Sequence, residues 1–354
     1  MRILYAFQGT GNGHQTRAKE FIPLFKKHAQ VDILVSGGAP NKVFDFPTDY
    51  RFKGLGFRFG KKGGIDVIQS FRDLKSVQFL REINTAPIAS YDLVVNDFEP
   101  VTAWACRRSQ IPIVGMSHQA AVIHPQAPKP NRLDWFGMQV LERFAPVDHS
   151  IGFHFQAYTR EISTPVIRRA VRKLQPSIGA HVTVYLPAYS EARIIQTLRQ
   201  LPQEHWEVFS PRCNAPYQID NVEILPVHPD TFLHSMSNSS GVICGAGFET
   251  PSEALYLGKP LLTIPMRGQF EQQCNAYALK QMGVAVLDEF SNASLRNLAD
   301  WLEKRPLIKV NYPDESKKLV QRALEYASTQ EKIEKTAQSL LNQKSPHRLK
   351  MRGF

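Results

Sequence analysis

The residues best suited to chemistry lie between positions 239 and 275, in the stretch SSGVICGAGFETPSEALYLGKPLLTIPMRGQFEQQCNA. Gly245, Ala246 and Gly247 follow a short apolar run and precede a predicted helix with Thr250 at its start. A glycine loop leading into a helix N-terminus can bind an anion, because free N–H groups and the positive end of the helix dipole point outward. Diphosphate is the natural ligand for this loop. The alternative is an ordinary connection between a strand and a capped helix.

The start of this helix has the residue types of a capping box. Thr250 is the expected N-cap, Pro251 takes the first helical position, and Glu253 falls at the third. Gly258 then ends the helix, a role that glycine commonly fills.

The loop from Met266 to Asn275 is rich in Gln and Glu and follows a predicted buried strand. Glu271 and Gln272 are poor core residues, but their side chains can exchange hydrogen bonds with sugar hydroxyls. The two loops together therefore favour a ligand that carries both phosphate and sugar.

Polar residues also follow three predicted strands in the first 120 residues: His14, Asp97 with Glu99, and His118. Open parallel sheets bind ligands at the carboxyl ends of their strands. Histidine as a residue type suits a general base, so His14 is the candidate base; Asp97 could hold and polarise it, with Glu99 as a competitor. Structural roles are open for each: His14 bonded to the backbone, Asp97 as the helix cap before Pro100, and His118 as a satisfied buried histidine.

The first glycine turn, Gln8 to His14, superficially matches a dinucleotide-binding fingerprint. The fingerprint needs a third glycine, but that position holds His14 or Thr16, depending on where the count begins. The second strand ends in Ser36 without an acid to bind a ribose. A nicotinamide site is therefore excluded.

The order glycine loop, Thr, Ser-Glu-Ala-Leu, Gly-Lys-Pro, apolar strand, Gln-rich loop and Asn-Ala resembles the donor half of GT-B glycosyltransferases. It is most similar to the group that contains the UDP-glucuronosyltransferases and the enzyme that glycosylates the lipid-linked peptidoglycan precursor. The first 20 residues share the resemblance, which implies an α/β protein with two Rossmann-like, doubly wound parallel-sheet domains facing a cleft. It also implies sugar transfer from a nucleotide diphosphate, with UDP favoured, to an acceptor hydroxyl that is lipid-linked in some members.

The resemblance also implies roles for individual residues. His14 would be the base and Asp97 its partner, while Gly11, Gly13, Glu99 and His118 would lie on the acceptor side. On the donor side it implies contacts of Gly245, Ala246, Gly247 and Thr250 with the diphosphate, Glu253 with the ribose, Glu271 and Gln272 with the sugar, and Val227 and His228 with the nucleobase. Glu253 is thus assigned both to the helix cap and to the ribose, and one carboxylate cannot fully serve both.

Neither a catalytic metal nor a cofactor beyond the nucleotide-sugar is expected, because the chain has no Asp-x-Asp motif and the inverting members of the group usually need no metal. Retaining GT-B enzymes carry two glutamates separated by seven residues. The position eight before Glu253 is Gly245, which favours inversion by direct displacement.

Length and alternation of elements predict the domain layout. With 354 residues and 43% hydrophobic content, the chain can form two cores. We expect an acceptor-binding domain at 1–163, a linker at 164–180, a donor domain at 181–312, C-terminal helices at 313–343 that could return to the first domain, and a basic tail at 344–354. In the donor domain the predicted strands are 181–186, 206–210, 222–226, 240–244 and 260–265.

The net charge of +11 favours an anionic partner. A basic and aromatic stretch at 50–64 can be read as a strand with alternating faces or as a surface for an anionic lipid. We expect neither a signal peptide nor a membrane-spanning helix, because the apolar run from Ile3 to Phe7 is short and no stretch approaches the length that spans a bilayer. The four cysteines form no Cys-x-x-Cys pair. We expect reduced thiols and a cytoplasmic protein, with peripheral attachment to the inner face of the membrane left open.

Two other functions fit the same residues. A UDP-sugar 2-epimerase shares the fold and would act without an acceptor. A non-catalytic protein that binds nucleotide-sugars or nucleic acid also fits the charge, although no nucleic-acid motif is present and no nucleic-acid partner is expected.

Overall fold

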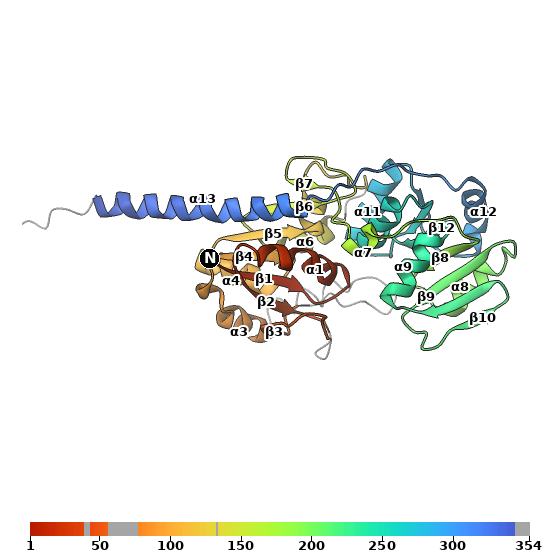
Figure 1. The fold of residues 1–354 in the computed structure, drawn as a ribbon, viewed down its shortest axis with the longest axis horizontal. Helices are drawn as coiled ribbons and strands as arrows, with labels where there is room; N and C mark the ends of the chain where they lie inside the picture. Colours follow the sequence, from red (N-terminus) through yellow and green to blue (C-terminus); the bar gives the residue numbers. More distant parts are fainter. Residues whose placement is uncertain (39–42, 56–76, 132–133, 344–354) are drawn as a thin grey trace, which may run out of the picture.

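The computed structural model describes residues 1–38, 43–55, 77–131 and 134–343, which form two α/β domains joined side by side (Figure 1). In the described residues each domain is built on a seven-stranded sheet. The first sheet is parallel throughout, in the order β3-β2-β1-β4-β5-β6-β7. Its strands are β1 (Arg2–Gln8), β2 (Gln30–Ser36), β3 (Tyr50–Phe52), β4 (Leu93–Asp97), β5 (Ile113–Ser117), β6 (His149–Phe153) and β7 (Ile162–Ser163).

The second sheet has the order β10-β11-β9-β8-β12-β13-β14, and it is parallel except for the edge strand β10. Its strands are β8 (His181–Tyr185), β9 (His205–Ser210), β10 (Tyr217–Ile219), β11 (Val222–Pro226), β12 (Gly241–Gly245), β13 (Leu261–Ile264) and β14 (Ala285–Val286). The central strands are nearly continuous apolar runs because helices cover both faces of the sheet. The predicted pair of doubly wound sheets is confirmed.

Helices connect the strands and pack on the sheets. They are α1 (Gly13–Phe25), α3 (Val77–Thr85), α4 (Pro100–Ser109), α5 (His118–Ile123), α6 (Trp135–Phe144), α7 (Arg169–Arg172), α8 (Glu191–Leu198), α9 (Pro229–Asn238), α10 (Glu249–Tyr256), α11 (Phe270–Gln281), α12 (Leu295–Lys304) and α13 (Ser316–Gln343). One buried apolar cluster runs from β1 through Phe248 to β12, so the two domains share a core at their junction.

The last helix, α13, follows a long return of the chain from the second domain and packs on α1 of the first (Figure 1). The Tyr312 hydroxyl donates to the Phe155 carbonyl oxygen at 3.0 Å, and the Tyr326 ring stacks on His149. These contacts tie the C-terminal segment to the first sheet.

Several local predictions differ from the structure. The apolar stripe after the first glycine turn predicts a helix from Thr16 to His28, but α1 begins at Gly13, because the Thr16 amide already donates to the Asn12 carbonyl oxygen. The short edge strands β7, β10 and β14 were not predicted, since two or three residues give no periodic signal. Helix α5, which has six residues, was not predicted either. Of the basic and aromatic stretch, residues 56–64 lie outside the described residues.

Candidate active site

A cavity of about 400 Å³ lies between the two domains. The first domain contributes the loop from Gln8 to Gly13 and residues of α1 and α6, and the second contributes the segments that precede α10 and α11. The cavity therefore has the two-sided lining that a reaction between two substrates needs. Predicted site residues on this lining are Gly11, Gly13, His14, His118, Gly247, Glu271 and Gln272.

His14 and Asp97 are in direct contact. The Nδ1 atom of His14 lies 2.8 Å from Oδ1 of Asp97. His14 is in the first turn of α1 and Asp97 is the last residue of β4, and β4 is the neighbour of β1 in the sheet. Adjacent parallel strands bring their carboxyl ends together, which is why residues 83 positions apart meet.

Arg17, one helical turn after His14, completes this group and was missed by the sequence reasoning. Its Nε atom lies 2.8 Å from Oδ2 of Asp97 and its Nη2 atom 2.9 Å from Oδ1. Burial alone would raise the pKa of the Asp97 carboxyl, but Arg17 and His14 outweigh it and hold that pKa below its ordinary value. The available signal was the i, i+3 spacing, which places both side chains on one helix face.

The ionised Asp97 fixes the tautomer of His14. Nδ1 lies near both Oδ1 of Asp97, at 2.8 Å, and Nη2 of Arg17, at 2.9 Å. Since a carboxylate only accepts hydrogen bonds and Nη2 already donates to Oδ1, we assign the proton to Nδ1. Nε2 is then the ring nitrogen that can take up a proton. A neutral imidazole oriented by a carboxylate is the arrangement of a general base.

Glu99 does not contact His14 but caps α4. Its carboxylate accepts from the amides of Val101 and Thr102, each at 2.7 Å, and from the Ser36 hydroxyl at 2.5 Å. It is fully buried, and burial raises the pKa of its carboxyl. The structural role considered for Asp97, the cap before Pro100, therefore belongs to Glu99.

His118 lies at the junction of the domains with both ring nitrogens in contact. Nδ1 is 2.7 Å from the Phe153 carbonyl oxygen, and Nε2 is 2.8 Å from Oδ1 of Asn275 in α11. The ring stacks on Phe248 with centroids 3.9 Å apart, and burial lowers the pKa of the imidazole. These contacts describe a buried histidine that connects the two domains.

The predicted capping box does not form. Helix α10 begins at Glu249, and its N-cap is Phe248, without a side-chain cap. Thr250 therefore lies inside the first turn rather than before it. The Ala246 amide donates to Ile264 in the sheet, so the amides of Gly247 and the following residues remain for an anion.

The Glu253 carboxylate is held by Arg168 of the segment between the two sheets. Both contacts, to Nε and Nη2, are 2.5 Å. Burial raises the pKa of the Glu253 carboxyl even though Arg168 opposes the shift. The Glu253 side chain is therefore not a helix cap; its partner is an arginine 85 residues away, and the ribose contact stays a prediction.

Glu271 and Gln272 lie in the first turn of α11. The Gln119 side-chain amide donates to Oε2 of Glu271 at 3.0 Å, a second polar contact between the domains. Gln272 accepts from the Met266 amide at 2.9 Å. Val227 and His228 are exposed just before α9 and do not line the cavity, so the structure separates the predicted nucleobase residues from the rest of the site.

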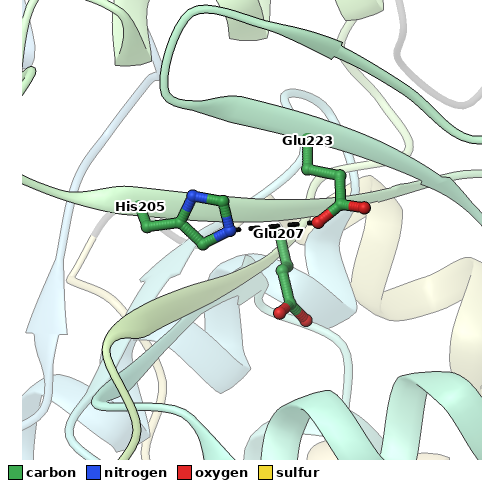
Figure 2. Close-up of side chains that lie close together, drawn as sticks. All are labelled: His205, Glu207 and Glu223. Atoms are coloured by element: carbon green, nitrogen blue, oxygen red, sulfur yellow. Dashed lines mark ion pairs between the residues drawn. The ribbon is translucent and has the colours of Figure 1, made fainter.

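One group of side chains in the described ranges has the spacing of metal ligands, namely His205, Glu207 and Glu223 on β9 and β11 (Figure 2). His205 and Glu207 are two residues apart on one strand, and Glu223 is paired in register with Glu207. None of the three lines the cavity. The group is thus separate from the candidate active site.

The two facing parallel-sheet domains, with the cavity between them, define the GT-B class of glycosyltransferases. The family model of glycosyl transferase family 1 matches residues 1–306, and the chain belongs to that family. It is accordingly a glycosyltransferase that uses a nucleotide-sugar donor. No curated protein matches the chain.

Solved structures show the same fold at low identity. The glycotransferase of kitacinnamycin is 13% identical, with a TM-score of 0.56, over 94% of this chain and 98% of that one. MurG of Acinetobacter baumannii is 17% identical, with a TM-score of 0.55, over 91% and 99%. UGT2 of Phytolacca americana, solved with UDP-2fluoro-glucose and pterostilbene, is 13% identical, with a TM-score of 0.55, over 93% and 94%.

No helix in the described ranges combines the length and apolar character needed to cross a membrane. All four cysteines are free and buried.

Proposed function

We propose that the protein is an inverting, metal-independent glycosyltransferase that moves a sugar from UDP to a hydroxyl of its acceptor. The single observation that carries this proposal is the buried Asp97–His14 pair, of which His14 lines a cavity shared by both domains. His14 takes the proton from the acceptor hydroxyl through Nε2, and Asp97 stabilises the imidazolium that forms. The hydroxyl oxygen then attacks the anomeric carbon as the bond to the diphosphate breaks.

The departing diphosphate lies at the start of α10. The Gly247 region and the helix N-terminus supply amide donors and a positive dipole for the developing charge. Glu271 and Gln272 contact the sugar, because both line the cavity beside this helix start. Preference for UDP is supported by the structural likeness to a plant enzyme solved with a UDP-sugar.

The acceptor enters from the first domain, past Gly11 and Gly13. A lipid-linked acceptor, and with it peripheral attachment to an anionic membrane, is supported by the net charge of +11 and by the likeness to MurG.

Calorimetry with nucleoside diphosphates tests the donor half of this proposal. UDP should bind to the unmodified protein and equally to His14→Ala. Turnover of the UDP-sugar with a hydroxyl acceptor should fall by at least about 100-fold in His14→Ala, which is the rate contribution of one general base. NMR of the product should show an inverted anomeric centre, and chelator should leave the rate unchanged. Conversion of the UDP-sugar to its epimer without acceptor would refute the assignment, as would retained turnover in His14→Ala.

A further inference from the structure

The cavity has an unusual charge balance for a site that is to hold a diphosphate. Among the described residues that line it, Arg17 carries the only guanidinium or ammonium group, while Asp134, Glu249 and Glu271 carry carboxylates. A dianionic ligand within this cavity therefore has Arg17 and backbone dipoles for compensation, while Arg193 and Arg267 line the neighbouring cavity beside Gly245. What Arg17 contacts before the ligand arrives then determines how well that ligand binds.

The two carboxylate partners of Arg17 differ in how firmly they are held. Asp97 is fully buried and fixed by the two-point contact with Nε and Nη2. The remaining nitrogen, Nη1, contacts Oε1 of Glu249 across the domain junction, and the Glu249 side chain keeps 29% of its surface exposed. Only the contact with Glu249 can exchange without uncovering a buried charge.

Glu249 is also placed where an anion is favoured. It is the first residue of α10, directly after the Gly245–Phe248 loop, so the helix dipole and Arg17 both attract its carboxylate. The carboxylate lies over the bare Cα of Gly13, and a Cβ at that position would be 2.4 Å from Oε2. The Glu249 carboxylate thus fills the space between the first glycine turn and the start of α10.

We propose that Glu249 acts as a gate: its carboxylate occupies the place on Arg17 that the donor diphosphate takes, and the diphosphate displaces it when the donor binds. This proposal rests on the proposed function, since it takes the start of α10 as the diphosphate site. On binding, the donor diphosphate exchanges with Glu249 at Nη1 while Arg17 keeps its contacts with Asp97. Arg17 thereby links donor binding to the orientation of His14 by Asp97.

The decisive experiment is calorimetric titration of Glu249→Gln with UDP and with inorganic diphosphate at low salt. Glutamine keeps the shape of the side chain and removes its charge, so the variant should bind both ligands about five to ten times more tightly than the unmodified protein. Arg17→Lys should bind them more weakly than the unmodified protein, because an ammonium cannot contact Asp97 at two points and the ligand at a third. The gain in Glu249→Gln should shrink as salt is raised.

Glu20→Gln is the matched control. Glu20 lies on the same helix as Arg17 and pairs with Arg169 at 3.3 Å, but it does not line the cavity. Glu20→Gln removes the same charge from the molecule as Glu249→Gln, so a general electrostatic effect would appear in both variants. The gate predicts unchanged UDP affinity for Glu20→Gln, and an equal gain in both variants would overturn it.

The outcomes separate the gate from the proposed function. If the unmodified protein binds UDP and Glu249→Gln binds it equally or more weakly, the gate is wrong and the proposed function stands. If neither protein binds UDP or inorganic diphosphate, both are wrong. Binding by Glu249→Gln alone would support both, as the extreme case of a closed gate.

Discussion

Replacement of Asp97 by Asn would test the proposed mechanism most directly. The carboxylate accepts from Nδ1 of His14 and from two nitrogens of Arg17, all between 2.8 and 2.9 Å. An amide of the same shape has one accepting oxygen and one donating nitrogen. Because Oδ1 accepts from both His14 and Nη2 of Arg17, and Oδ2 from Nε, the amide nitrogen faces a donor nitrogen of Arg17 whichever way the amide turns.

With the amide oxygen in the Oδ1 position, His14 Nδ1 and Arg17 Nη2 keep an acceptor and the amide nitrogen faces Nε of Arg17. Either orientation removes the negative charge that stabilises the imidazolium of His14, which weakens the proposed base. We expect kcat to fall by about 10² to 10⁴-fold, the range of one general base, with little change in the donor Kd. A change in the donor Kd alone would point to a binding role.

The same substitution reduces stability. Removing one partner of a buried ion pair costs about 3–5 kcal/mol, but here the Asn oxygen and Glu249 still contact Arg17, so we expect about 2–3 kcal/mol in urea unfolding at pH 7. Because the folded pKa of Asp97 lies below the unfolded value, its contribution is present above the unfolded pKa and is lost as pH falls through the folded one. The stability difference from Asp97→Asn should therefore shrink in acid. A kcat within threefold of the unmodified enzyme, in a folded variant, would refute the role of the pair.

Three further predictions concern buried contacts away from the reacting groups. Glu99→Ala should cost about 2–4 kcal/mol in urea unfolding, since it removes a helix cap and leaves buried donors unsatisfied. Arg168→Ala should cost about 2–4 kcal/mol in urea unfolding at pH 7, because it leaves Glu253 buried and unpaired. This cost should fall in acid, where Glu253 is protonated. The double variant Arg168→Ala with Glu253→Gln should regain most of the lost stability. Phe248→Ala should cost about 3 kcal/mol, because it opens a cavity beside His118 at the domain junction, and an unchanged unfolding midpoint would contradict that packing.

The fold could be predicted from the sequence because the pattern that predicts it extends over the whole chain. Apolar strands alternate with helices along the whole chain, and an error of two residues at a boundary leaves the parallel sheet unchanged. The His14–Asp97 contact follows from the same topology, since both residues end neighbouring strands or begin the next helix. Because β1 and β4 are neighbours in the sheet, the strand order alone predicts that His14 and Asp97 meet.

The partners of the carboxylates could not be predicted, because they are set by packing between distant segments. Glu253 matched the third position of a capping box, yet Arg168 takes its carboxylate and the helix starts earlier, at Glu249. Arg17 escaped notice because the glycine turn was read as a loop up to His14. Once α1 begins at Gly13, the positions of His14 and Arg17 on one face become apparent.

Helix α10 is where donor chemistry and domain geometry meet. Its two glutamates, Glu249 and Glu253, are four residues apart and therefore lie on one face of the helix. Each is held by an arginine from outside the second sheet: Arg17 of the first domain and Arg168 of the connecting segment. Any movement of one domain relative to the other must change at least one of these contacts. When a ligand draws Arg17 away from Glu249, the Arg168–Glu253 pair still anchors α10. The helix then adjusts to the diphosphate while it stays packed in the second domain.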